Sequence, residues 1–341
     1  MERRTLSLLA VGSLLLACQP DTPTTPPTAA PVADADADAG PAASETAEPT
    51  EEEARAARLA ARLAELETVK ADNAKRWTPE LTAAATKLAG AKYKNAGAAI
   101  TAIVASGHRH PDNVARDPQR HPVETLKFFG ITQKMTVVEM GPGAGWYSEI
   151  LAPFLAKSGK HVVNNGDPDG PETEGGTFYA RRFQYFLDQS AEVYGKVVQE
   201  RPEGDTLNIG AAGSADAVLI IRGLHGHARR GTLDATLKTV HTTLKKGGIL
   251  GVVQHRAADD ADVAESSPAG YVPQPWLVEQ IEAQGFKLKG ASEVNANPKD
   301  TRDHAEGVWT LPPSMALGDK DADKYKAIGE SDRMTLRFVK K

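Results

Sequence analysis

A buried strand that runs into a glycine loop and then into a helix constrains this chain more than any other feature. Residues 135–140 form an apolar run that ends beside the acidic Glu139, and Gly141, Gly143 and Gly145 follow at alternate positions before a helical pattern. A unit of this kind brings backbone N–H groups and a helix N-terminus against a bound ligand. A tight turn without a ligand is the alternative, but three alternate glycines are more than a turn needs.

The spacing of the glycines distinguishes between classes of ligand. The nicotinamide-dinucleotide fingerprint reads G-x-G-x-x-G, and Trp146 stands where its third glycine would be. Pro142 also removes one N–H donor from the loop. The sequence reads E-x-G-x-G-x-G instead, which resembles motif I of the class I S-adenosylmethionine (SAM) methyltransferases.

Strand and helix patterns alternate from residue 123 to the end of the chain. Alternation of this kind predicts an α/β fold with a doubly wound, seven-stranded and mostly parallel sheet, preceded by an N-terminal helical extension. Since no helix separates the last two strands, one of them is expected to be antiparallel. The predicted strands are 135–140, 160–164, a short one near 207–209, 215–222, 249–254, 286–294 and 334–339, and the predicted helices are 123–129, 146–157, 177–198, 233–244 and 276–284.

This inventory resembles the Rossmann-like methyltransferase fold, whose final strand inserts antiparallel between the fifth and sixth. The turn at residues 244–248, Leu-Lys-Lys-Gly-Gly, is also similar to the family's L-K-P-G-G turn before its fifth strand. The resemblance covers about residues 123–341. More narrowly, the chain resembles a group of bacterial predicted methyltransferases that are often exported, through the segments 116–117 with 120–122, 125–130, 295–300, 307–313 and 329–334.

The resemblance implies SAM as the cofactor and assigns residues to it. Glu139 with Gly141, Gly143 and Gly145 would hold its methionine part, and Tyr147 at the start of the helix either reaches the ligand or packs under the loop. A carboxylate normally takes the ribose hydroxyls at the end of strand two. In this sequence asparagines stand at the end of strand two. Asp167, the nearest carboxylate, is therefore the expected ribose ligand.

The acceptor side is expected at the ends of strands four and five, because ligands of open α/β sheets bind outside the carboxyl ends of the strands. Arg222, His225 and His255 are the candidate catalytic residues there. A neutral imidazole could take a proton from the acceptor atom; alternatively, His225 only bonds loop carbonyls. The pairs His108/His110 and His225/His227 raise the possibility of a metal, but the sequence has neither HExxH nor C-x-x-C, and we expect none.

The N-terminus has the features of a bacterial lipoprotein signal. A basic start and a short apolar run, too short to span a bilayer, lead to Leu-Leu-Ala-Cys at residues 15–18. We expect lipidation of Cys18, the only cysteine, and anchoring to a membrane on the periplasmic side, and Gln19 favours the outer membrane. The expected organisation is a signal peptide at 1–18, a disordered linker rich in Pro, Thr, Ala and Asp at 19–50, a helical extension at 51–105 and a methyltransferase-like domain at 106–341.

Two further regions leave their roles open. The helix that follows Thr50 has one narrow leucine stripe, so it either packs on the main domain or forms a stalk. The polar segment 107–122 holds three histidines, three arginines and three prolines. Long polar loops in compact chains are either functional or disordered; we favour a lid or entry segment.

The sequence therefore supports two hypotheses about function. The first is a SAM-dependent methyltransferase that acts on a small molecule, a lipid or an envelope component. The second is a non-catalytic envelope lipoprotein that uses the same fold for binding or as a scaffold, because SAM is made in the cytosol and an exported enzyme has no obvious supply. A net charge of −5 argues against a nucleic-acid partner.

Overall fold

The computed structural model describes residues 50–171, 173, 175–204 and 206–341. The lipidation site Cys18, the signal peptide 1–18 and all but the last residue of the linker 19–50 lie outside these residues. The described helices are α1 Glu51–Arg76, α2 Pro79–Gly90, α3 Ala96–Val104, α4 Pro111–Val114, α5 Asp117–Arg120, α6 Pro122–Phe129, α7 Ser148–Leu155, α8 Gly175–Asp188, α9 Ala191–Tyr194, α10 Leu224–Arg229, α11 Leu233–Thr243, α12 Val263–Ser266, α13 Gln274–Ala283 and α14 Ala322–Ile328, with a 3-10 turn at Gly307–Thr310. None of them is both long enough and apolar enough to cross a bilayer.

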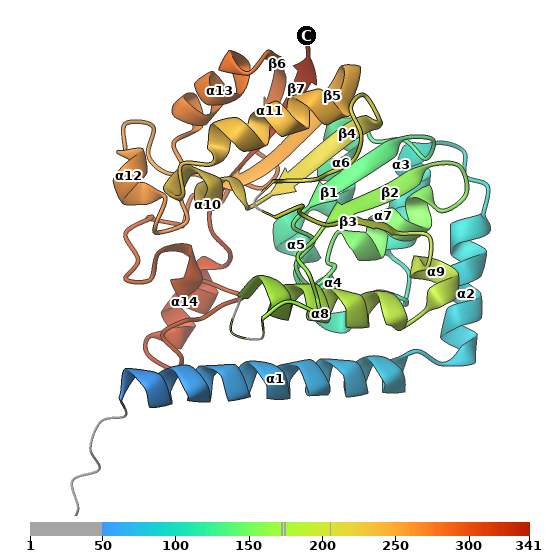
Figure 1. Cartoon of the computed structure of the whole chain (residues 1–341), viewed down its shortest axis with the longest axis horizontal. Coiled ribbons are helices and arrows are strands. Elements are labelled where there is room, and N and C mark those ends of the chain that lie inside the picture. Colours follow the sequence, from blue (N-terminus) through green and yellow to red (C-terminus); the bar gives the residue numbers. More distant parts are fainter. Residues whose placement is uncertain (1–49, 172, 174, 205) are drawn as a thin grey trace, which may run out of the picture. The chain divides into compact units, whose positions relative to one another are not determined.

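A seven-stranded sheet forms the centre of the protein (Figure 1). Its order is β3-β2-β1-β4-β5-β7-β6, with β7 antiparallel to both β5 and β6 and the first five strands parallel. The predicted fold class is thereby confirmed, including the final strand between the fifth and sixth. The prediction that no helix separates the last two strands was wrong, because α14 and the 3-10 turn lie between β6 and β7. The strands are β1 Thr136–Met140, β2 Lys160–Asn164, β3 Val198–Glu200, β4 Ala215–Ile221, β5 Leu244–His255, β6 Phe286–Ser292 and β7 Arg333–Lys340.

Successive side chains of each central strand enter two different cores, because side chains alternate between the faces of a sheet. On one face Val137 and Leu219 pack with the apolar side chains of α3, α6 and α7. On the other face Val138 and Val218 pack with α11 and α13. The sheet is therefore covered on both sides, as the unbroken apolar run of β4 predicts for a central parallel strand.

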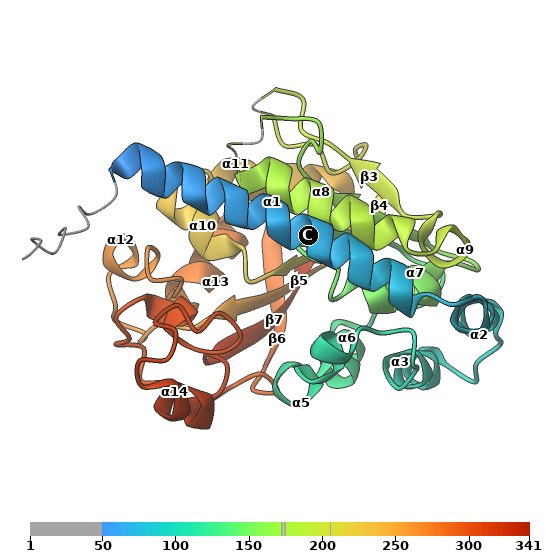
Figure 2. The same cartoon turned by 90° about the horizontal axis from the view of Figure 1, so that it is seen from below.

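The N-terminal helix α1 packs against α8 (Figures 1 and 2). A capping box starts it, in which the Thr50 hydroxyl accepts from the Glu53 amide and the Glu53 carboxylate accepts from the Thr50 amide. Glu65 of α1 forms a 2.5 Å ion pair with Arg182 of α8. These contacts decide between the two possibilities that the sequence left open, in favour of packing rather than a free stalk.

One strand prediction was wrong. The third strand lies at Val198–Glu200 and pairs with β2, whereas residues 207–209 form a loop. The expected helix 177–198 accordingly divides into α8 and α9 followed by this strand. Ile209 supplied the misleading signal, because it is buried in the core although its backbone is irregular.

Candidate functional site

The glycine loop after β1 presents its backbone to open space. Gly141 and Gly143 have φ values of +60° and +58°, which L side chains rarely adopt. A Cβ built on either glycine would meet no atom within 4 Å. The Gly141 amide donates to the Asn164 carbonyl at 3.2 Å, which fixes the loop to the end of β2. A ligand can therefore approach the backbone at these two positions.

The third glycine serves packing instead. Gly145 has φ +85°, and a Cβ there would stand 2.8 Å from Cγ of Phe186 on α8. The helix after β2 therefore lies closely against the loop and limits its movement. Of the three glycines predicted to hold SAM, Gly141 and Gly143 therefore have free space at the Cβ position, whereas at Gly145 this space is filled by Phe186.

Glu139 is buried and holds the loop and its neighbouring strand together. Its Oε2 accepts from the Ser148 hydroxyl, at the start of α7, at 2.7 Å. The same oxygen lies 3.1 Å from Nε2 of His161 on β2. Both contacts use Oε2. Glu139 thus connects its own strand to β2 and to the start of α7. Its other carboxylate oxygen, Oε1, makes neither of these two contacts.

The end of β2 offers amides rather than a carboxylate. Asn165 is buried, and its Nδ2 donor has no hydrogen-bond partner among the described residues. The side-chain amide of Asn164 donates to the backbone carbonyl of Asn208 at 2.7 Å. Asp167 is more than half exposed and lies 3.4 Å from Arg201. The predicted ribose ligand Asp167 therefore sits in a surface ion pair, and Asn165 is the side chain at this strand end with a free buried donor.

The two aromatic residues after the loop are buried against each other. The rings of Trp146 and Tyr147 meet edge to face, with centroids 4.7 Å apart. Burial raises the pKa of Tyr147 to about 12, so its phenol stays protonated at neutral pH. The guanidinium groups of Arg109 and Arg120 lie over the Trp146 ring, at 5.3 and 5.2 Å from its centroid.

The polar segment 107–122 is packed onto this region and includes the short helices α4 and α5. His108 is buried, with Nε2 2.7 Å from the Glu149 carbonyl. Arg109 is also buried, beside Asp117 and 3.6 Å from the Glu149 carboxylate. The Trp146 indole donates to the Asn113 carbonyl at 2.9 Å. The segment therefore forms a fixed wall beside the glycine loop rather than a free flap.

The N-terminal extension closes one side of the same region. A cavity of about 180 Å³ lies between α1, α8 and the segment 107–122, with Ala144 of the glycine loop in its wall. Its lining is mostly polar, including Asp72, Arg116, Glu149 and Arg182.

The three residues predicted for the acceptor side lie together at the ends of β4 and β5. The rings of His225 and His255 are 6.0 Å apart. Burial lowers the pKa of His225, and burial together with the charge of Arg222 holds the pKa of His255 well below its usual value. Both imidazoles are therefore neutral at pH 7. Nδ1 of His255 lies 2.5 Å from the Ser331 hydroxyl.

Sequence reasoning missed a buried charge cluster next to these residues. Nε of Arg120 donates to both Glu330 oxygens at 2.9 Å, and Arg333 donates to the same carboxylate at 2.7 Å. Arg222 lies 3.9 Å from it. Arg120 and Glu330 are 210 positions apart, so no local pattern pairs them. Both fall in segments of the narrower resemblance, which was the available signal.

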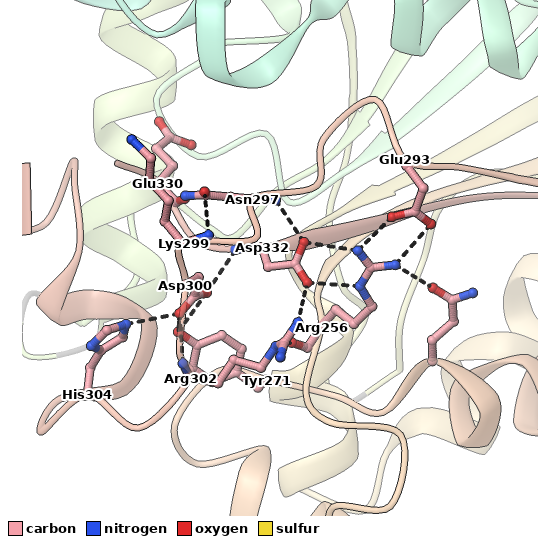
Figure 3. Close-up of polar contacts among 11 residues, drawn as sticks. Arg256, Tyr271, Glu293, Asn297, Lys299, Asp300, Arg302, His304, Glu330 and Asp332 are labelled. Carbon is pink, nitrogen blue, oxygen red and sulfur yellow. Dashed lines mark hydrogen bonds and ion pairs between the residues drawn. The ribbon is translucent and has the colours of Figure 1, made fainter. Parts of the chain in front are cut away.

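A second polar network holds the segment before β7 in place (Figure 3). The Asp332 carboxylate accepts two hydrogen bonds from Arg256, at 2.9 and 3.0 Å, and one from Arg302 at 2.7 Å. The Asp332 amide donates to Asp300, which also accepts from the Tyr271 hydroxyl. Because Glu330 and Ser331 directly precede Asp332, this network positions them against β4 and β5.

The histidine pairs are engaged in protein contacts. Nδ1 of His227 lies 3.0 Å from the hydroxyls of Thr232 and Thr236, and His110 lies 3.7 Å from Asp112. Within the described ranges, no group of three His, Cys, Asp or Glu side chains is arranged to hold a metal ion.

No protein-family model and no curated protein matches this chain. Among solved structures, it is similar to a SAM-dependent methyltransferase from Aquifex aeolicus, with 15% identity, 73% of this chain and 99% of that chain covered, and a TM-score of 0.44. A SAM-dependent methyltransferase from Mesorhizobium loti has 12% identity, 64% and 97% coverage and a TM-score of 0.40. The [4+2]-cyclase SpnF has 14% identity, 65% and 80% coverage and a TM-score of 0.43. Likeness at these identities concerns the fold, and the activity has to be argued from the site.

Proposed function

We propose that this chain is a SAM-dependent methyltransferase whose acceptor binds at the carboxyl ends of β4 and β5. The observation that carries the proposal is the open backbone at Gly141 and Gly143, at the end of the first strand and next to the point where the strand order reverses. Ligands of doubly wound sheets bind at such switch points. The strand order with an antiparallel β7 between β5 and β6 supports the same function.

The residues around the loop fit the cofactor. Gly141 and Gly143 would let the methionine part pass close to the backbone, and Oε1 of Glu139 would be available to its ammonium group. The buried free donor of Asn165 would meet the ribose hydroxyls, in place of the carboxylate usual at this point. When bound, SAM supplies an activated methyl group and its own leaving group.

The residues at β4 and β5 would then position the acceptor. Aligning two bound reactants can lower the activation barrier by about 7–11 kcal/mol. The position of the acceptor therefore matters more for the rate than acid–base chemistry does. The neutral imidazoles of His225 and His255 can each accept a proton released from an oxygen or nitrogen nucleophile.

Calorimetric titration of the purified full-length protein with SAM tests the proposal. We expect saturable binding by the wild type and at least a tenfold weaker affinity for Gly143→Ala, whose methyl group would occupy the open face. Gly213→Ala is the matched control, because Gly213 has a similar φ of +64° and an equally open Cβ position at the other end of the sheet. Absence of binding by the wild type, or equal affinity in Gly143→Ala, would contradict the proposal.

The second candidate function is a non-catalytic envelope lipoprotein that uses the fold for binding. The observation that favours it is the lack of a carboxylate at the end of β2, where Asp167 pairs with Arg201 at the surface. Export and anchoring through Cys18 remain proposals from the sequence, and they favour this second function because SAM is made in the cytosol. Radiolabelled palmitate should label the wild type but not Cys18→Ala, and labelling of both would contradict the anchor.

A further inference from the structure

Positive charge exceeds negative charge where β4 ends. Three guanidinium groups, those of Arg120, Arg222 and Arg333, surround the single carboxylate of Glu330. Arg120 and Arg333 hold it at hydrogen-bonding distance, and their side chains are 5% and 3% exposed. One carboxylate therefore faces three positive charges, and its contact with Arg222 is the longest of the three, at 3.9 Å.

Arg222 is the member of this cluster that remains available. Its nearest carboxylate oxygen is 3.9 Å away, and its guanidinium makes no hydrogen bond within the part of the chain that the structure describes. Its side chain is 26% exposed. Burial and the neighbouring Arg120 lower its pKa to about 9, which still leaves it charged at neutral pH. A guanidinium with this freedom presents a planar fork of donors that matches an oxyanion.

The backbone holds Arg222 in an unusual conformation. Its φ is +60°, and its amide donates to the Val253 carbonyl of β5 at 2.6 Å. Non-glycine residues in this region are strained and persist where the surrounding structure imposes them, often at ligand sites. The bond to β5 thus fixes the direction in which the side chain leaves the end of β4.

A row of rings continues from Arg222 across the acceptor side. His255 lies 6.0 Å from His225, and His225 lies 5.8 Å from Trp309, measured between ring centroids. Trp309 is 38% exposed, which is high for so large an apolar side chain. The rings are inclined to one another by 59° and 71°. Since both imidazoles are neutral, the row is an uncharged aromatic surface with Arg222 as the neighbouring cation.

We propose that the acceptor is a small molecule with an oxyanion, a carboxylate or phosphate, that pairs with Arg222, and with a flat ring that packs against Trp309. The inference rests on the proposed methyltransferase function and specifies the class of its substrate. The oxyanion satisfies the free guanidinium and offsets the surplus positive charge. The ring covers the exposed indole. The carboxylate of SAM itself is the competing occupant of Arg222, so the experiment separates the two.

The test uses benzoate and phenyl phosphate as probes and benzyl alcohol as the uncharged comparison. Each is titrated by tryptophan fluorescence and calorimetry into the full-length protein, with and without saturating SAM. We expect both anions to bind the SAM-saturated wild type and benzyl alcohol to bind at least tenfold more weakly. Arg222→Gln should weaken anion binding at least tenfold and Arg222→Lys less, while the SAM affinity of both stays within twofold. Trp309→Leu should weaken all ring-bearing probes.

Arg229→Gln is the matched control, because Arg229 is an exposed arginine at the end of α10, close to the same site. It should leave anion binding unchanged. Equal anion affinity in wild type and Arg222→Gln would overturn the inference. So would a tenfold loss of SAM affinity in Arg222→Gln together with exclusion of the anions by SAM, which would assign Arg222 to the cofactor. Anion binding without any SAM binding would support the oxyanion site at Arg222. It would contradict only the proposed methyltransferase function.

Discussion

The ring of Phe186 lies over Gly145, so that a Cβ at position 145 would stand 2.8 Å from the ring. Gly145→Ala therefore has to distort the loop or displace α8, in addition to adopting a φ of +85°. We expect a loss of about 2–4 kcal/mol in the free energy of unfolding, from overpacking and from the positive φ. Urea denaturation of wild type and variant measures it.

Gly143→Ala is the control for this change. Its φ is also positive, but its Cβ position is open, so we expect only the backbone cost of about 1–2 kcal/mol. Phe186→Leu should recover part of the loss in a Gly145→Ala background, because the two residues are in contact. Equal losses in Gly143→Ala and Gly145→Ala would show that the helix does not press on the loop.

The sheet was predictable because its signals are local. The apolar run of β4 and the glycines after β1 each lie within a few residues of sequence. The position of β7 between β5 and β6 was instead implied by the resemblance to the methyltransferases. The third strand was not predictable, since Val198–Glu200 is three half-buried residues after a helix, with no apolar run of its own.

Only those residues of the candidate site that lie at the ends of the sheet strands were predictable from the sequence. Arg222, His225 and His255 follow strand ends, so their proximity follows from the topology. The contribution of Arg120 and Glu330 could not be derived, because their ion pair joins a segment before β1 to one before β7. Asp167 remains the predicted ribose ligand, and its observed contact is the surface ion pair with Arg201 at 3.4 Å.

The carboxylate of Asp332 is expected to be among the most important for stability outside the glycine loop. It is 2% exposed and accepts from Arg256, Arg302 and the amide of Asn297. Removing one partner of a buried charge pair costs about 3–5 kcal/mol, so Asp332→Asn should lower the free energy of unfolding by that amount. Thermal denaturation of the purified protein measures the change.

Glu293→Gln provides the comparison, because Arg256 binds this carboxylate as well, at 2.7 Å. Glu293 is 63% exposed, and exposed ion pairs contribute about 0–1 kcal/mol. The two variants should therefore differ by at least about 2 kcal/mol. A similar effect of both would mean that the number of ion pairs, and not their burial, determines the stability of this segment.

Two contacts of α1 are expected to differ in strength. Arg76 donates to the carbonyls of His108 at 2.5 Å and Arg109 at 3.2 Å. Arg76→Ala leaves these backbone groups without their partner and should cost about 1–3 kcal/mol. Glu65→Gln breaks only the partly exposed pair with Arg182 and should cost less than about 1 kcal/mol. Hydrogen exchange should show faster opening of segment 107–122 in the first variant, and equal exchange in both would contradict the prediction.

His255 should make the protein less stable in mild acid. Burial and the charges of Arg222 and Arg333 hold its pKa well below 6.5 in the folded state, while the unfolded chain binds a proton near pH 6.5. Its contribution to stability is therefore complete above pH 6.5 and is lost as the pH falls below it, by up to about 1.4 kcal/mol per pH unit. Urea denaturation at pH 7.5 and 5.5 should show a decrease that is about 1 kcal/mol smaller in His255→Gln than in the wild type. The same decrease in both would contradict the prediction, because it would mean that folding does not lower the pKa of His255.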